Sequence, residues 1–430
     1  MRGLLPILVS VATACASARE SVIASPPLDV GVAGFAVMKA RHAGTDYLLL
    51  LESLTSLLEL DGPHRVLRRF GPDGAVLEYA APAGTELADF AAHPDGDVSI
   101  LVVTEAGYAL ERWLPDGSRS GAVPIADVAP TPFSHDAGRI AAAGAEVVLA
   151  LRARDNSVHG YRYAPEGAGY RAVWQALVEP ANDLLPIGLT SGSFDTFGQL
   201  ENRFRSYVEV APDGAIWVGI LLDPGSDLLD AHNAAFGDDL RPISDTSPSY
   251  DVLVTRLAGS GDRVFSRVVG TQWHDEMYAM RAVANELLIV GRTETTPGAA
   301  GGWDALLAHV RDDGVVSVQT IDVDAADVLF DVDALPDGRL IAVGGTGYVQ
   351  NPSGASISES CALLAMVLTG ATTSRLGLPS LPRHNQLRTV LAGESTLWVG
   401  GMTNGPGTHS GDSDPSLIRA DPFVAALPLP

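Results

Sequence analysis

The chain has little lysine and little cysteine, and its charge balance and cysteine count each exclude a class of protein. Its 28 basic residues include a single lysine, Lys39, and the net charge at pH 7 is -24. Because so acidic a field repels phosphate groups, we expect neither nucleic acid nor an anionic lipid surface as a partner. The two cysteines, Cys15 and Cys361, exclude a disulfide framework once Cys15 is removed or modified with the N-terminal segment.

Long apolar runs are absent beyond the N-terminus. Arg2 is followed by the apolar stretch LLPILVSVATA at residues 4–14 and then by small residues. This stretch is too short to cross a membrane, and a basic start, an apolar centre and small residues are typical of an export signal. We therefore predict a signal over residues 1–18, a linker over 19–30 and the folded protein over 31–430.

Two ways of processing this signal remain open. Ala12-Thr13-Ala14-Cys15 resembles a bacterial lipobox, in which Cys15 would carry the lipid, whereas Ala16-Ser17-Ala18 fits cleavage by ordinary signal peptidase. The first alternative predicts a periplasmic or outer-membrane lipoprotein whose only membrane contact is the lipid anchor. The second predicts a secreted protein.

A tight turn that leads into a short apolar strand recurs seven times. Such a recurrence indicates one supersecondary unit stacked on itself. The copies are Gly44-Thr45-Asp46 into YLLLL, Pro94-Asp95-Gly96 into VSILVV, Gly144-Ala145-Glu146 into VVLAL, Pro212-Asp213-Gly214 into AIWVGI, Asn285-Glu286 into LLIVG, Pro336-Asp337-Gly338 into RLIAVGG and Gly393-Glu394-Ser395 into TLWVGG.

A second turn follows each of these strands some tens of residues later, for example Pro115-Asp116-Gly117 and, in the last repeat, Ala420-Asp421-Pro422. Each repeat is therefore expected to hold four antiparallel strands, A to D, with tight A–B and C–D turns. Repeats of this kind predict an all-β fold, a seven-bladed β-propeller. A fallback has six blades and an N-terminal extension, because residues 48–60 also fit a short helix. The predicted blades are 31–83, 84–127, 132–179, 203–271, 272–324, 325–381 and 386–428.

The best-formed repeats resemble a known family. Asp251-Val-Leu-Val-Thr-Arg-Leu257, followed by Gly261, Val269-Gly270, Asp275 and LLIVG ending at Gly291, is similar to the SBBP-type β-propeller repeat of bacterial surface and secreted proteins. Asp304 to Val310 begins a second copy, and the resemblance covers about residues 250–345. It implies a β-propeller at the cell surface or outside the cell, and it implies no catalytic residues.

The long insertions all fall at one end of the repeats, in the B–C loops and the D–A crossovers. Because long loops on a rigid scaffold are where binding usually resides, we predict that this loop face is functional. The insertions are 180–202, 221–249, 293–303, 346–360 and 403–415. The candidate site residues of this face are Asp227, Asp230 and His232 in the second insertion, His409, Asp412 and Asp414 in the last, and Trp273, His274 and Asp275 in the crossover from blade four to blade five.

The acidic residues of these loops raise the question of a metal. Carboxylate oxygens are hard ligands that suit Ca²⁺, but no loop here has Asp-x-Asp-x-Asp-Gly spacing. The favoured interpretation is therefore that these acidic loops are solvated and hold no cofactor. Four further aspartates, Asp322, Asp324, Asp331 and Asp333, alternate with apolar residues and are predicted on the exposed side of strands.

No sequence motif for nucleophilic, metal-assisted or phosphate chemistry is present. The favoured function is therefore a non-catalytic binding or scaffold protein at the bacterial envelope, with a protein or glycan partner. The alternative is a propeller hydrolase or lyase that assembles acidic and histidine side chains from several blades at the channel mouth.

Overall fold

In a computed structural model, the part of the chain that is described consists almost entirely of strands, with one helix. No helix in that part is long and apolar enough to span a lipid bilayer. The described residues are 35–53, 65–71, 75–79, 81–104, 106–125, 128, 138–182, 206–222, 227–243, 250–295, 302–324, 326–347, 362–369, 372–378, 385–393, 395–403 and 421–430.

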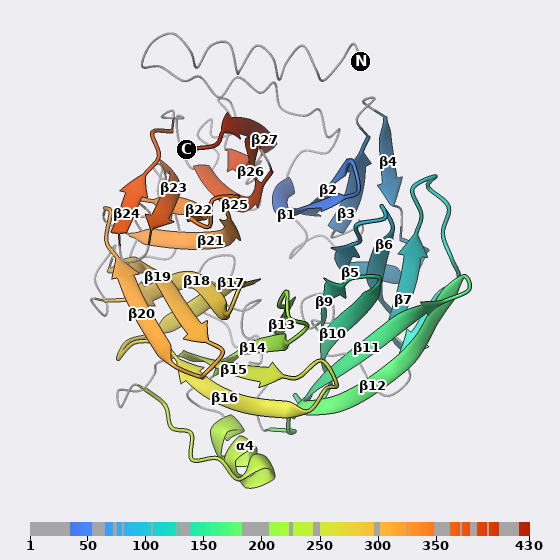
Figure 1. Cartoon of the computed structure of the whole chain (residues 1–430), viewed down its shortest axis with the longest axis horizontal. Coiled ribbons are helices and arrows are strands. Elements are labelled where there is room, and N and C mark those ends of the chain that lie inside the picture. Colours follow the sequence, from blue (N-terminus) through green and yellow to red (C-terminus); the bar gives the residue numbers. More distant parts are fainter. Residues whose placement is uncertain are drawn as a thin grey trace, which may run out of the picture. The chain divides into compact units, whose positions relative to one another are not determined.

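The strands form seven antiparallel sheets, and within each sheet the strands lie side by side in chain order (Figure 1). The fold is thus a seven-bladed β-propeller, as the repeats predict. The first four sheets are β1 (Phe35–Ala43), β2 (Asp46–Ser53), β3 (Arg65–Phe70) and β4 (Val76–Tyr79); β5 (Thr85–Ala92), β6 (Val98–Thr104), β7 (Gly107–Trp113) and β8 (Val123–Ile125); β9 (Gly138–Ala143), β10 (Glu146–Arg152), β11 (Val158–Glu166) and β12 (Gly169–Glu179); and β13 (Ser206–Val210), β14 (Ile216–Leu222), β15 (Asp251–Leu257) and β16 (Arg263–Val269). The last three are β17 (Asp275–Val283), β18 (Glu286–Glu294), β19 (Trp303–Arg311) and β20 (Val316–Ile321); β21 (Asp327–Ala334), β22 (Leu340–Thr346), β23 (Ala362–Thr369) and β24 (Thr372–Arg375); and β25 (Asn385–Ala392), β26 (Thr396–Thr403) and β27 (Asp421–Pro428).

Six sheets lie inside the blades predicted for them, and the seventh begins one residue before its predicted blade, at Asn385. The six-bladed fallback is excluded because the first repeat forms a sheet of its own. Its segment 46–53 is β2, paired on both sides, so the apolar run there is a strand where it is described. One predicted turn is wrong. Ala420-Asp421-Pro422 does not connect strands C and D, because Asp421 already begins β27, which pairs with β26 as the third strand.

The chain divides into two compact units. One unit comprises Met1–Ala80, Gly298–Ala305 and Ile321–Pro430, and its apolar clusters lie between the sixth and seventh sheets and between the seventh and first. The other comprises Ala81–Pro297 and Leu306–Thr320, with apolar clusters that join each successive pair among the second to fifth sheets. Apolar side chains between faces of neighbouring sheets therefore hold each unit together.

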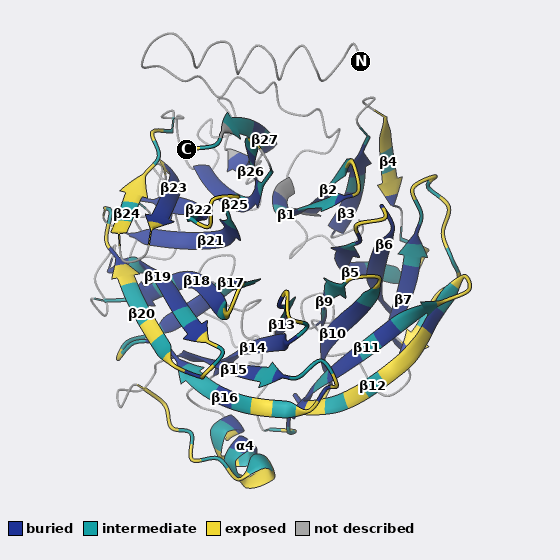
Figure 2. Ribbon diagram, in the orientation of Figure 1, coloured by how far each residue is buried: buried dark blue, intermediate teal, exposed yellow. Residues whose placement is uncertain are grey.

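Burial follows strand position within a sheet (Figure 2). Second strands such as β14 are buried along their whole length, whereas fourth strands such as β12 are exposed or half-buried except near their ends. Trp217, in β14, is fully buried and belongs to a core cluster.

Glycines near the ends of the second strands let the backbone of the first strand approach them closely. Gly344 pairs with Leu329 next to a register shift in β21, and a Cβ on Gly344 would lie 1.8 Å from the carbonyl oxygen of Val328. Gly291 and Gly401 occupy the same place opposite the shifts in β17 and β25. Any side chain here would collide with backbone, so the glycine at this position is required by the fold.

Polar side chains that follow such a shift join first strands of neighbouring sheets; Asp331 follows the shift in β21, and Asp89 follows a similar one in β5. Asp331 accepts a hydrogen bond from the backbone N–H of Val390 at 3.0 Å, and Asp89 accepts one from that of Ile140 at 3.1 Å. Asp333 likewise accepts from the N–H of Ala392 at 2.9 Å. The prediction that Asp331 and Asp333 are exposed is wrong, because the first strand of a sheet meets the next sheet on the side where these carboxylates lie. Asp322 and Asp324 are exposed, as predicted, but they follow the end of β20 and are not part of a strand.

Candidate functional site

The insertion between β14 and β15 contains the helix of the described residues, α4 (Leu228–Phe236), which lies beside the outer strand β16 (Figure 1). Leu228 and His232, one turn apart, are its buried residues and face the fourth sheet. The helix ends at Gly237, whose left-handed backbone (φ 74°) allows its N–H to bond the carbonyl of Asn233. The side chain of Asn233 then bonds both the N–H and the carbonyl of Leu240, which fixes the chain after the helix.

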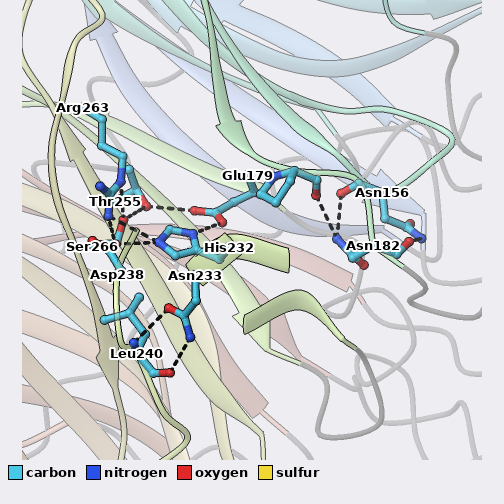
Figure 3. Close-up of polar contacts among 11 residues, drawn as sticks. Asn156, Glu179, Asn182, His232, Asn233, Asp238, Leu240, Thr255, Arg263 and Ser266 are labelled. Carbon is cyan, nitrogen blue, oxygen red and sulfur yellow. Dashed lines mark hydrogen bonds and ion pairs between the residues drawn. The ribbon is translucent and has the colours of Figure 1, made fainter. Parts of the chain in front are cut away.

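His232 attaches this helix to two sheets (Figure 3). Its Nδ1 lies 2.6 Å from Oε2 of Glu179, the last residue of β12, and its Nε2 lies 2.9 Å from Oδ2 of Asp238. The other oxygen of Glu179 accepts a hydrogen bond from the hydroxyl of Thr255, in β15, at 2.9 Å. Arg263, in β16, forms a close ion pair with Asp238. One imidazole therefore links the insertion to the third and fourth sheets.

The surroundings of His232 favour its charged form. Burial lowers its pKa, but the hydrogen bond and negative charge of Glu179 and the hydrogen bond of Asp238 outweigh burial and raise the pKa above its ordinary value. With a carboxylate at each ring nitrogen, both nitrogens must act as donors. The side chain has no exposed surface, so this imidazolium is a structural cation and cannot reach a solute.

The crossover from β16 to β17 contains the candidates Trp273, His274 and Asp275. Asp275 is buried and accepts hydrogen bonds from the N–H of Thr271 at 2.5 Å and from its hydroxyl at 3.0 Å. Asp327 does the same in the next repeat, where it accepts from the N–H of Val323 at 2.5 Å and from the hydroxyl of Thr346. The aspartate that opens a first strand thus closes its crossover loop, which is a structural role that recurs.

Glu276, next to Asp275, is buried in an ion pair. Arg292 binds both of its oxygens, at 3.0 and 3.1 Å, and the hydroxyl of Tyr278 donates to it at 2.5 Å. Nε2 of His274 lies 3.5 Å from the same carboxylate. Burial acts to raise the pKa of Glu276, but the positive charge of Arg292 and the hydrogen bond of His274 hold it well below its usual range. The carboxylate is therefore fully engaged.

The remaining candidates from the sequence lie in different surroundings. Asp227 and Asp230 are exposed at the start of α4, on the opposite side from His232. Trp273 is half-buried, and the ring of His274 packs against Tyr250 with centroids 4.3 Å apart. Cys15, His409, Asp412 and Asp414 lie outside the described residues.

Sequence reasoning did not find Glu179, Thr255 or Arg263, the partners of the His232 attachment. Glu179 belongs to the preceding repeat, and Thr255 and Arg263 lie in strands that follow the insertion, so no local motif joins them to His232. It also passed over one group of carboxylates suited to a metal. Asp304, Asp322 and Asp327 each offer an oxygen, and these oxygens lie within 4.8 Å of one another.

No family model matches the chain, so the SBBP-type repeat rests on the sequence resemblance alone, and no curated protein matches. Solved structures with a similar fold include an inactive variant of virginiamycin B lyase from Staphylococcus aureus (12% identity, 93% of this chain and 97% of that one, TM-score 0.47). Others are a putative 6-phosphogluconolactonase from Bacteroides uniformis (13%, 89% and 100%, 0.45) and YCF48 bound to a D1 peptide (10%, 86% and 90%, 0.48). Enzymes and a binding protein both occur among them, so the similarity concerns the propeller fold and not an activity.

Proposed function

We propose that this protein is an exported, non-catalytic binding propeller of the bacterial envelope, and that α4 and the neighbouring loops of the fourth and fifth sheets bind a partner protein or glycan. The observation that supports this most is the attachment of α4 by His232, which holds one side of the helix against two sheets. The opposite side, with Asp230, Ala234 and Ala235, is exposed. A rigidly held, exposed helix can bind a partner at little cost in conformational entropy.

The engagement of the candidate acids and histidine disfavours the hydrolase or lyase alternative at this site. Catalysis requires titratable groups that converge on one accessible point. His232 and Glu276 are instead buried between fixed partners, and Asp275 closes a loop. These groups stabilise the scaffold that presents the binding surface.

A photo-crosslinking amino acid at position 234, on the exposed side of α4, tests the binding surface. The matched control places the same probe at position 262, in the exposed turn between β15 and β16 at the other end of the strands. With intact bacterial envelopes, position 234 is expected to capture a defined protein or glycan that position 262 does not. Capture of the same set from both positions would contradict a role for α4.

Export is tested separately, by the mass of the protein recovered from an expressing bacterium. The lipobox alternative predicts a mature chain that begins at lipidated Cys15 and that Cys15→Ala fails to produce. The signal peptidase alternative predicts an unmodified chain that begins at Arg19 and is unaffected by Cys15→Ala. Recovery of the full-length chain in the cytoplasm would contradict export.

A further inference from the structure

Two successive repeats place aspartates at the same pair of positions on the loop face. Asp251 begins β15, a third strand, and Asp275 begins β17, the first strand of the next sheet. One repeat later Asp304 is the second residue of β19, and Asp327 begins β21. Each pair therefore joins the end of a B–C loop to the end of the following D–A crossover.

The carboxylates of Asp251 and Asp275 converge over Gly270. A Cβ on Gly270 would lie 2.6 Å from Oδ1 of Asp251 and 2.5 Å from Oδ2 of Asp275, so only a glycine lets both carboxylates pack this close to the backbone. Asp251 is 2% exposed and Asp275 is fully buried. Oδ2 of Asp251 accepts the N–H of Ile243 at 3.0 Å, but its Oδ1 is buried with no hydrogen-bond partner.

A buried carboxylate oxygen without a partner is costly, and a second carboxylate beside it increases the cost. Burial raises the pKa of Asp251 to about 7 and that of Asp275 to about 6, and the charge of Asp275 contributes to the shift at Asp251. Within the described ranges, no lysine or arginine forms an ion pair with either group. What is missing from this arrangement is a positive charge between the two oxygens.

The next repeat has the same arrangement with one more ligand. Asp322 precedes Asp327 by five residues, as Gly270 precedes Asp275, so a third carboxylate takes the place of the glycine. Oxygens of Asp304, Asp322 and Asp327 lie within 4.8 Å of one another, and Asp322 is exposed, which leaves this copy open to solvent.

We propose that this recurring position is a divalent-cation site of the Ca²⁺ type, with one cation between Asp251 and Asp275 and a second held by Asp304, Asp322 and Asp327. Ca²⁺ takes carboxylate and water oxygens in flexible geometry, and water completes its shell where the protein supplies only two or three ligands. Each cation would join a B–C loop to the crossover beside it and so stabilise the loop face. Of its ligands, only Asp275 belongs to the acidic loop residues considered in the sequence; the others lie at or next to strand ends.

The test is titration of the chelator-treated full chain with CaCl₂ by calorimetry, and with Tb³⁺ by luminescence excited through tryptophan, since Trp273 and Trp303 adjoin the two sites in sequence. We expect two saturable sites per chain. Asp251→Asn should remove one and Asp304→Asn the other, with at least a tenfold loss of affinity at the altered site. Asp116→Asn, in an exposed turn, is the matched control and should leave both sites unchanged.

Circular dichroism distinguishes loss of a ligand from loss of the fold, and Asn keeps the shape of Asp at each position. If Asp251→Asn fails to fold, Asp304→Asn tests the proposal on the more exposed copy. The proposal is overturned if the native chain shows no saturable Ca²⁺ or Tb³⁺ binding, or if both variants keep its stoichiometry.

Discussion

The hydroxyl of Thr389 donates a hydrogen bond to Oδ2 of Asp331 at 2.9 Å and accepts one from the backbone N–H of Ala40 at 3.1 Å. Three first strands, β21, β25 and β1, are joined through these two bonds. Ala40 and Thr389 are 349 positions apart in the chain, so the link ties the first repeat to the last. Both polar side chains are buried, and the energetic value of the link lies in leaving neither of them unsatisfied.

Replacing Thr389 by valine should therefore destabilise the fold. The change removes the hydroxyl, keeps the shape and leaves the N–H of Ala40 and one acceptor site of Asp331 without a partner. We expect a loss of about 1–3 kcal/mol in the free energy of unfolding, measured by urea denaturation. Thr372→Val, at an exposed position in β24, is the control and should change it by less than about 0.5 kcal/mol. Equal effects of the two substitutions would show that the link contributes nothing.

Gly344→Ala should be strongly destabilising. The new methyl would overlap the carbonyl of Val328, and the strand pairing at the register shift would have to open. We expect a cost of about 3 kcal/mol or more. Gly377→Ala, where nothing lies within 4 Å of the new Cβ, should cost little in the same thermal or urea denaturation. A neutral Gly344→Ala would contradict the close approach seen here.

His232→Ala should loosen α4 and lower stability, because it leaves the buried carboxylate of Glu179 without its cation. Breaking a buried ion pair by removing one partner typically costs about 3–5 kcal/mol. Asp230→Ala, on the exposed side of the same helix, serves as control. If His232→Ala and Asp230→Ala unfold at the same urea concentration, His232 does not attach α4 to the sheets as described.

Titration of His232 should contribute to the pH dependence of the protein's stability. Its pKa in the folded state is raised, so its stabilising effect is complete below about pH 6.5, the ordinary value for histidine. The effect is lost as pH rises through the folded-state pKa. As pH rises from the ordinary histidine pKa through the folded-state pKa of His232, the melting temperature of the native chain should therefore fall relative to that of His232→Gln. A difference between the two that grows with rising pH would mean that His232 is neutral when folded.

The fold was predictable from the sequence because its determinants are local. Turn residues such as Pro212-Asp213-Gly214 and closing glycines such as Gly344 act within one repeat, and the repeat recurs seven times. The burial of Asp331 was not predictable, because alternation along a strand cannot show that the N–H of Val390, 59 positions later, requires an acceptor. Glu179 was missed for the same reason, since its partner His232 lies 53 positions later, inside the insertion between β14 and β15.

The central claim is that α4 is a fixed part of the scaffold and presents its exposed side to a partner. Hydrogen–deuterium exchange of the free protein tests it most directly, because exchange of the α4 amides reports whether the helix opens independently of the sheet. We predict that the hydrogen-bonded amides of α4 exchange slowly, and that His232→Gln accelerates them at least tenfold while those of β15 are unchanged. Rapid exchange of the α4 amides in the native chain, unaltered by His232→Gln, would contradict the account.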